Sequence, residues 1–419
     1  MSPNRRHVLA ALGGLAFTGS RAMADTPFPR LQALIDRTVG SGEVPGLAVG
    51  VEANGRPVEW RAAGTIALDS DQPIGPRTVC RVASMTKLVA GVTALQLVED
   101  GMFGLDQPIH EIAPEFREMK VVRADGSTEA ARRPITVRHL LNFTAGIPHV
   151  WQGGPASIAY REAGLDKMGH HQVVPVQPQD APAPRTLEEW ALRLAKLPLA
   201  SHPGEDWHYG YCMDVMGFVM ERATRTPFAE LLRERTLRPL KMDDTDFFVR
   251  PDQVDRLATN YTRTDGKLAV FDDRKASKWM DREVVPSGGG GLVSTGADYA
   301  RFCRMLLNGG ELGGVRVASA RAVKTATSNL LPPEVERPQF VLDRADWGAG
   351  AAVHNPTSVA PGRSVGSYGW AGGTGGTAFW VDPTHGFFVV VMMQRMMGDP
   401  NDTLHRQIEL AVAQDLGLA

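Results

Sequence analysis

Ser84 and Lys87 form an S-x-x-K motif, and their types and spacing could support nucleophilic chemistry. A serine hydroxyl becomes an effective nucleophile only when a neighbouring group takes its proton. A lysine amine can do so once desolvation lowers its pKa well below about 10.4. Residues three apart on a helix stand about 60° from each other, so these two side chains can meet. The motif is weak by itself, because a serine that caps a helix and a solvated lysine one turn later have the same spacing.

Tyr209 offers a second group that could share the serine proton. It follows Pro203-Gly204 on a loop and precedes a helical pattern that begins near Met213. A phenol held on such a loop can act together with a lysine, because a nearby cation lowers its pKa below about 10. Taken alone, Tyr209 is better interpreted as a half-buried aromatic residue whose hydroxyl has a hydrogen-bond partner.

Residues 369–376 contain five glycines in eight positions and lie between two strand patterns. Glycines without side chains allow another backbone to come close. An edge strand here could present a backbone N–H to an oxyanion and bind a substrate amide or ester by strand addition. The alternative is a glycine-rich hairpin without a ligand.

A competing nucleophile motif, G-x-S-x-G, occurs at residues 362–366, with Asp382 and His385 following in α/β-hydrolase order. That motif requires a buried strand before the serine and a helix after it. Here Pro361 precedes the motif and a strand pattern follows. We therefore interpret Ser364 as a loop residue.

The S-x-x-K motif lies at the start of a predicted buried helix. From residue 88 to 98 apolar residues fill most of the helix circumference, and Gly101 provides a stop signal. The free N–H groups and the positive dipole end of such a helix would favour an oxyanion beside Ser84.

The remaining pattern predicts a helical middle between two α/β pieces, which join in one antiparallel sheet with terminal helices packed on it. The fold class is therefore α/β in the broad α+β sense. We expect an α/β domain at 25–80 and 290–419 and a mainly helical domain at 81–289, with a long loop region at 148–184. Predicted helices cover 31–39, 135–141, 187–197, 213–225, 227–237, 297–307 and 403–416, and predicted strands cover 46–51, 57–62, 348–353, 367–370, 377–381 and 386–393.

Composition excludes several functional classes. The 419 residues carry 45 Lys and Arg against 47 Asp and Glu, so nothing indicates a nucleic acid or an anionic membrane surface as partner. The three cysteines, Cys80, Cys212 and Cys303, are widely spaced and fit small core residues better than disulfides or a zinc site. Adjacent His170 and His171 share no face on a helix or strand, so we expect no metal.

Residues 1–24 have the pattern of an export signal. Arg5-Arg6 precedes an apolar run at residues 8–17, and Ala22-Met23-Ala24 forms an A-x-A cleavage site. The paired arginines suggest the twin-arginine route. The run of ten apolar residues is shorter than the ~20 that a spanning helix needs. We expect cleavage after Ala24, a periplasmic protein and no stable membrane insertion.

Three motifs in this order resemble the serine β-lactamase and penicillin-binding protein superfamily. They are Ser84-x-x-Lys87, Tyr209 after a Pro-Gly, and Trp370-x-Gly372 before Gly-Thr-Gly-Gly. More narrowly, the chain resembles family VIII carboxylesterases, the esterase relatives of class C β-lactamases. The likeness spans nearly the whole chain after the export signal. It implies a β-lactamase-like fold, with an antiparallel sheet flanked by terminal helices plus an all-helical domain.

The resemblance implies a role for each matching residue. Ser84 would be the nucleophile, and Lys87 and Tyr209 would form the general base or a proton relay. The backbone N–H groups of Ser84 and Gly373 would form the oxyanion hole.

Two departures from class C β-lactamases favour an ester substrate. Tyr211 stands where those enzymes have asparagine, and Trp370-Ala371-Gly372 stands where they have Lys-Thr-Gly. We expect these four residues to contact the substrate. The missing lysine would help hold a β-lactam carboxylate, whereas Trp370 offers an aromatic wall and one N–H donor, which suits a neutral ester.

We therefore expect a serine carboxylesterase that forms an acyl-enzyme at Ser84 and acts on small carboxylic esters. The second enzymatic hypothesis is a β-lactamase or D-amino-acid peptidase. From another class, the chain could be a non-catalytic penicillin-binding or cell-wall-binding protein. The expected partner is a small-molecule ester or amide, without a cofactor, and the oligomeric state stays open.

Overall fold

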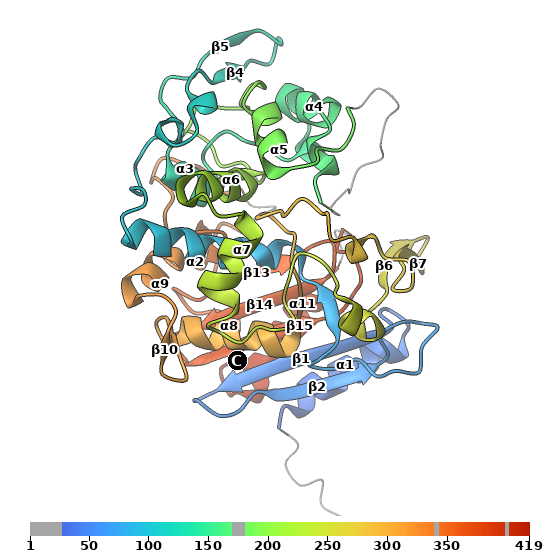
Figure 1. Cartoon of the computed structure of the whole chain (residues 1–419). Helices are drawn as coiled ribbons and strands as arrows, with labels where there is room; N and C mark the ends of the chain where they lie inside the picture. Colours follow the sequence, from blue (N-terminus) through green and yellow to red (C-terminus); the bar gives the residue numbers. More distant parts are fainter. Residues whose placement is uncertain (1–26, 170–180, 339–342, 399–401) are drawn as a thin grey trace, which may run out of the picture.

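Figure 1 shows the computed structural model of the chain, which describes residues 27–169, 181–338, 343–398 and 402–419. The predicted export signal at 1–24 and the pair His170-His171 lie outside these residues. Within the described ranges, no helix has the length and apolar character needed to cross a bilayer.

Seven strands form one antiparallel sheet that joins both ends of the chain. Their order is β11-β12-β13-β14-β15-β1-β2, so that β1 lies between β15 and β2. The bounds are β1 Gly46–Ala53, β2 Glu59–Gly64, β11 Asp346–Trp347, β12 Ala352–Val353, β13 Tyr368–Gly372, β14 Thr377–Asp382 and β15 Phe387–Met392. The predicted antiparallel sheet is confirmed.

Both faces of this sheet are buried, each under its own helices. Val389 and Val391 of β15 lie in the core beneath the terminal helices. Phe388 and Val390 belong to the core on the other side. Successive strand residues point to opposite faces, which explains why β15 is apolar throughout. The terminal helices are α1 Pro29–Gly40 and α11 Leu404–Asp415, and α8 Gly296–Leu307 packs on the opposite face.

The predicted serine helix, α2 Thr86–Glu99, runs between the sheet and the helical part (Figure 1). Every residue from 86 to 97 is buried. Gly91 lies so close to a neighbouring loop that a Cβ there would stand 2.0 Å from the Ala349 carbonyl oxygen. Gly101, with a φ of 72°, follows the helix as the predicted stop. The turn that carries the serine, η1 Ala83–Met85, is 3-10 rather than α-helical.

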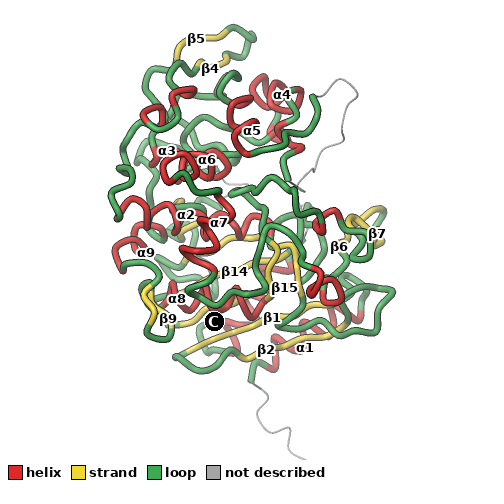
Figure 2. The backbone as a smooth tube through the Cα atoms, in the orientation of Figure 1, coloured by secondary structure: helices red, strands yellow, loops and turns green. Residues whose placement is uncertain are grey.

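The helical part begins and ends at a short antiparallel pair, β3 Val79–Arg81 and β8 Val293–Thr295. Figure 2 shows that most helices of this part gather away from the sheet. They are α3 Val137–Leu141, α4 Gly154–Glu162, α5 Leu187–Leu194 and α6 Cys212–Thr224. The short α7 Phe228–Leu232 instead extends past α2 toward the sheet (Figure 2). Two hairpins accompany them, β4 Lys120–Val122 with β5 Thr128–Ala130, and β6 Asn260–Thr264 with β7 Lys267–Asp272. The division into domains at 81–289 stays a prediction.

Three local predictions differ from the structure. The predicted loop region at 148–184 contains α4 and two 3-10 turns, η4 Val150–Gln152 and η5 Leu165–Lys167. Pro155 hides this helix in the sequence, although proline fits a first helical turn. Of the predicted strand 348–353, residues 348–351 form the hairpin turn between β11 and β12, where Gly350 has a φ of 96°, and only 352–353 are strand, as β12. The predicted helix 227–237 divides into α7 and a π-helical turn, η6 Arg233–Leu237.

The three cysteines are buried and unpaired, which fits the predicted core role. Burial raises the pKa of Cys80 and of Cys212 to about 12, so these thiols stay protonated at neutral pH. The described part of the chain also holds no cluster of three metal-ligating side chains.

Candidate active site

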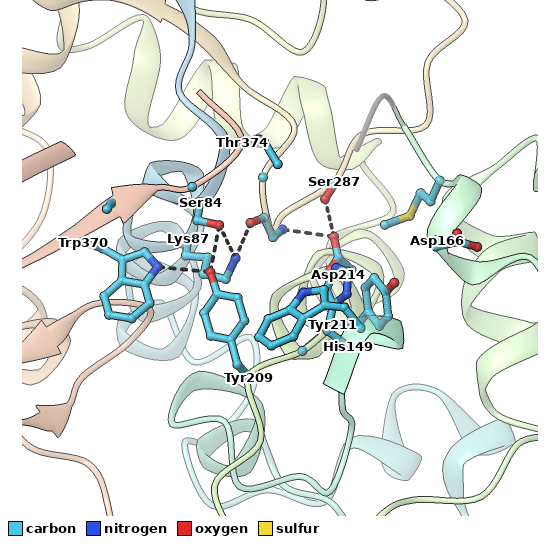
Figure 3. Close-up of a pocket in the computed structure, with 18 of the residues that line it drawn as sticks. Ser84, Lys87, His149, Asp166, Tyr209, Tyr211, Asp214, Ser287, Trp370 and Thr374 are labelled. Carbon is cyan, nitrogen blue, oxygen red and sulfur yellow. Dashed lines mark hydrogen bonds between the residues drawn. The ribbon is translucent and has the colours of Figure 1, made fainter. Parts of the chain in front are cut away.

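Ser84 and Lys87 meet at the wall of a pocket, as Figure 3 shows. Lys87 Nζ donates a hydrogen bond to Ser84 Oγ over 3.0 Å and another to the carbonyl oxygen of Gly289. Lys87 is only 3% exposed, so its amine has little access to water. Ala83, just before the serine, has a φ of 45°, a strained conformation that costs about 1–3 kcal/mol and persists where packing fixes the backbone.

Tyr209 reaches the same serine from its loop. Its hydroxyl donates to Ser84 Oγ over 2.8 Å, and Trp370 Nε1 donates to the Tyr209 oxygen over 3.1 Å. The backbone is held because Tyr209 O accepts from His149 N. The ring is held against Phe143, with centroids 5.8 Å apart. Tyr209 is therefore fixed in position by backbone and ring contacts rather than by its hydroxyl alone.

Lys87 and Tyr209 thus converge on Ser84 Oγ, although Tyr209 lies 125 positions from the serine in the sequence. Lys87 Nζ also lies 4.6 Å from the centroid of the Tyr209 ring. Either partner of Ser84 is within the distance that proton transfer requires. The three residues that the motifs predicted are brought together.

The glycine-rich turn after β13 packs directly on the segment that leads to Ser84. A Cβ at Gly372 would lie 2.3 Å from Val82 O, and one at Gly375 would lie 2.3 Å from Arg81 O. Gly373, in contrast, has no atom within 4 Å of a Cβ position. The sequence predicted that these glycines leave room for another molecule. In the structure only Gly373 does so. Gly372 and Gly375 instead leave room for backbone carbonyls of this chain.

Ser84 and Gly373 both border the pocket. Neither backbone N–H donates to another backbone group among the described residues. Backbone N–H groups that border a pocket without a backbone partner are the kind of donor that stabilises an oxyanion.

The pocket has a volume of about 720 Å³, within the range of sites that hold drug-sized ligands. Its lining is mainly apolar and aromatic and includes Leu165, Met168, Tyr211, Trp370, Met396 and Met397. The only lysine or arginine among the described lining residues is Lys87. Of the predicted contact residues, Ala371 lies on the pocket wall, and Gly372 does not.

Tyr211 lines the pocket but is almost entirely buried. It is 6% exposed, and its ring stacks on His149 with centroids 4.5 Å apart. Burial raises the pKa of the Tyr211 hydroxyl well above its ordinary value, so the hydroxyl stays protonated. The residue that replaces asparagine therefore adds apolar surface.

Asp214 is a pocket residue that the motifs did not predict. Its Oδ1 accepts hydrogen bonds from Ser287 Oγ over 2.5 Å and from Gly289 N over 3.0 Å (Figure 3). Burial raises the pKa of this carboxyl, while the hydrogen bonds and the charge of Lys87 oppose the rise. Asp214 thus fixes the segment whose Gly289 carbonyl holds Lys87. The sequence offered one indication of this role, namely an acidic residue, Asp214, inside the apolar stretch of α6.

We expect Asp214→Ala to lower kcat for a p-nitrophenyl ester about tenfold or more, because Lys87 loses its fixed carbonyl partner. Asp214→Asn keeps an acceptor oxygen and should recover most of the rate. Asp298→Ala is the matched control, since buried Asp298 also accepts a backbone and a hydroxyl hydrogen bond but lies outside the pocket lining. Full activity of Asp214→Ala would contradict the assignment.

The G-x-S-x-G motif does not form a catalytic triad. Ser364 Oγ donates to Asp382 Oδ1 over 2.7 Å, and His385 Nδ1 lies 3.2 Å from Asp382 Oδ2. In a triad the histidine stands between serine and aspartate, whereas here the aspartate stands between the other two. The motif precedes strand β13, and none of its three residues lines the pocket. The interpretation of Ser364 as a loop residue is confirmed.

The fold combines a seven-stranded antiparallel sheet with a helical part, and Ser84, Lys87 and Tyr209 meet at one pocket. These features define a serine hydrolase of the β-lactamase fold. The β-lactamase family model matches residues 31–414, and the chain belongs to that family. The resemblance to the superfamily, and to its esterases, is confirmed.

The relatives include esterases and acyltransferases. Esterase EstB of Burkholderia gladioli is 27% identical over 382 residues, covering 87% of this chain and 89% of the relative. Protein Rv1367c of Mycobacterium tuberculosis strain H37Rv is 31% identical over 377 residues, with the same two coverages. Unliganded simvastatin synthase LovD of Aspergillus terreus, as the selenomethionyl derivative, superposes with a TM-score of 0.77 at 25% identity, covering 94% of this chain and all of the other.

Proposed function

We propose that this protein is a carboxylesterase that forms an acyl-enzyme at Ser84. The observation that carries the proposal is the contact of Ser84 Oγ with both Lys87 Nζ and Tyr209 OH at the wall of a mainly apolar pocket. The similarity to esterase EstB supports it.

The reaction would take two balanced steps. In the first, Ser84 Oγ attacks the ester carbonyl carbon, its proton passes to Lys87 or Tyr209, and the N–H groups of Ser84 and Gly373 stabilise the oxyanion. The alcohol leaves with that proton as the C–O bond breaks. In the second step, water attacks the acyl-enzyme and gives a proton to the relay, and the acid is released as Ser84 regains its hydrogen.

The arrangement around Trp370 supports an ester rather than a β-lactam. The indole N–H is engaged by Tyr209, so Trp370 faces the pocket with its apolar ring and not with the donor that the sequence suggested. With Lys87 occupied by Ser84 and Gly289, the described lining offers no further lysine or arginine to a β-lactam carboxylate. The pocket volume admits esters considerably larger than the small ones expected from the sequence.

An ester series and nitrocefin, assayed on one preparation, test this proposal. We expect turnover of p-nitrophenyl esters and little nitrocefin hydrolysis. Faster nitrocefin turnover would instead support a β-lactamase or peptidase, and an adduct that never turns over would support a penicillin-binding protein. Because several relatives are named acyltransferases, added alcohols should also be examined as acyl acceptors in place of water.

Trp370→Phe should lower kcat about tenfold with little change in KM, because it removes the N–H that stabilises negative charge on the Tyr209 oxygen during proton relay. Steady-state kinetics on a p-nitrophenyl ester measures both constants. Trp380→Phe is the matched control, since Trp380 is buried in the core beneath the terminal helices. Equal kcat values for Trp370→Phe and the parent protein would exclude this role.

We also infer that the enzyme acts in the periplasm after removal of residues 1–24. A mature protein whose first residue is Asp25 would support this inference, and an intact N-terminus in the cytoplasmic fraction would refute it.

A further inference from the structure

Gln394 lies just beyond β15, is 2% exposed and does not line the pocket. Its side-chain oxygen accepts hydrogen bonds from Arg81 N over 2.9 Å and from Arg81 Nη1 over 3.1 Å. Its amide nitrogen donates back to Arg81 O over 3.2 Å. Gln394 therefore hydrogen-bonds to both the backbone N–H and the backbone C=O of Arg81, which stands three positions before Ser84.

The same amide nitrogen also lies 3.2 Å from Gly375 O, in the turn that contains Gly373, and 2.8 Å from Met393 O, so its two hydrogens are shared among three carbonyl oxygens. The chain after Gln394 adds two bonds to that turn. Arg395 N donates to Gly375 O over 3.1 Å, and Met397 N donates to Gly373 O over 2.7 Å. One side chain thus joins the segment before the nucleophile to the turn that presents the second N–H.

The two segments that Gln394 joins pack tightly against each other. A Cβ at Gly375 would lie 2.3 Å from Arg81 O and 2.8 Å from Gln394 Nε2. Thr377 Oγ1 makes a parallel bond to Val82 O over 3.3 Å. A shift of either segment would therefore change the gap between the Ser84 and Gly373 N–H groups.

We propose that Gln394 is a positioning residue that sets the separation of the two oxyanion donors, Ser84 N–H and Gly373 N–H. The inference rests on the proposed function, which assigns these donors. Backbone N–H groups stabilise an oxyanion only within a narrow range, about 2.7–3.1 Å from its oxygen. The alignment of these N–H groups changes the stability of the transition state far more than that of the bound substrate. Loss of the Gln394 hydrogen bonds therefore lowers kcat and leaves KM nearly unchanged.

The Arg81 guanidinium keeps other partners when Gln394 is replaced, so the Gln394 hydrogen bonds can be removed without leaving an unpaired buried charge. Its guanidinium pairs with Asp272 and donates to Ser277 Oγ and to Ala258 O. Gln394→Met preserves side-chain length and removes all amide hydrogen bonds. Gln96→Met is the matched control, because Gln96 is also buried and donates to two carbonyl oxygens, those of Arg235 and Val317, outside the pocket.

The experiment measures kcat and KM for a p-nitrophenyl ester, the inhibition constant of a boronic acid, and the rate at which a fluorophosphonate labels Ser84, followed by intact mass. In the labelling step the Ser84 O–P bond forms, the P–F bond breaks, fluoride leaves and the proton passes to the relay. We expect Gln394→Met to lower kcat and labelling at least tenfold, to weaken boronate binding in parallel, and to change KM less than about twofold. Gln96→Met should lose comparable thermal stability but keep all four values.

Unchanged kcat and labelling in folded Gln394→Met would overturn the inference, as would an equal loss in Gln96→Met. Absence of labelling in the parent protein would instead refute the proposed nucleophile, so the two failures are distinguishable. If Gln394→Met does not fold, Thr377→Val removes the parallel bond to Val82 and provides the test. A kcat lowered at least threefold with constant KM would support the inference, and an unchanged kcat would overturn it.

Discussion

Replacement of Ser84 by alanine should abolish hydrolysis of p-nitrophenyl esters, with kcat reduced about 10⁴-fold or more. The Oγ atom removed is the one on which Lys87 Nζ and Tyr209 OH converge, so no other described group of the pocket is prepared to attack the ester. Stopped assays at high enzyme concentration measure the residual rate. Intact mass after brief exposure to ester should show an acyl adduct on the parent protein and none on Ser84→Ala.

Ser364→Ala is the control that makes this result specific. Ser364 donates to Asp382 and lies outside the pocket lining, so its loss should leave kcat within about twofold. If Ser364→Ala were inactive and Ser84→Ala active, the nucleophile would lie at the G-x-S-x-G motif and the assignment of the site would be wrong.

Tyr209→Phe should reduce kcat about 10²–10⁴-fold, the range typical of a lost general acid–base group. The substitution keeps the ring and its contacts with Phe143 and Trp347 and removes only the hydroxyl that bonds Ser84. Thermal stability should therefore change little while the rate falls. Burst kinetics separates the acylation and deacylation steps, and we expect both to slow because the relay serves both.

Tyr160→Phe is a suitable comparison, since Tyr160 is fully buried and does not line the pocket. Parent-like kcat for Tyr209→Phe would mean that Lys87 alone takes the serine proton. A parent-like rate for Tyr160→Phe beside a large loss for Tyr209→Phe would assign the effect to the hydroxyl at Ser84.

Local pattern was sufficient to predict most elements that position the site. The apolar run of α2 predicted a buried helix behind Ser84, and strand-like patterns toward both chain ends predicted the sheet. Short elements were missed because their stability comes from tertiary contacts rather than from their own sequence. The pair β3–β8 has three residues in each strand, and α4 is masked by glycine and proline at its start.

The three side chains that meet at Ser84 Oγ were predictable because each belongs to a motif, whereas the residues that support them were not. Asp214 and Gln394 act through residues 75 and 313 positions away in sequence, Gly289 and Arg81. No local pattern encodes such a pair. The engagement of the Trp370 N–H by Tyr209 was also hidden, because a donor and its acceptor 161 positions apart become visible only in the fold.

The place of β1 in the sheet has a consequence for synthesis of the protein. Ala48 pairs with Met392, so β1 acquires β15 as its partner only after residue 392 has left the ribosome. Closing such a long loop costs entropy before contacts repay it, which makes folding of high-contact-order sheets slow. During that interval β1 presents an unpaired apolar edge, and a nascent chain in this state is prone to aggregate or to require a chaperone.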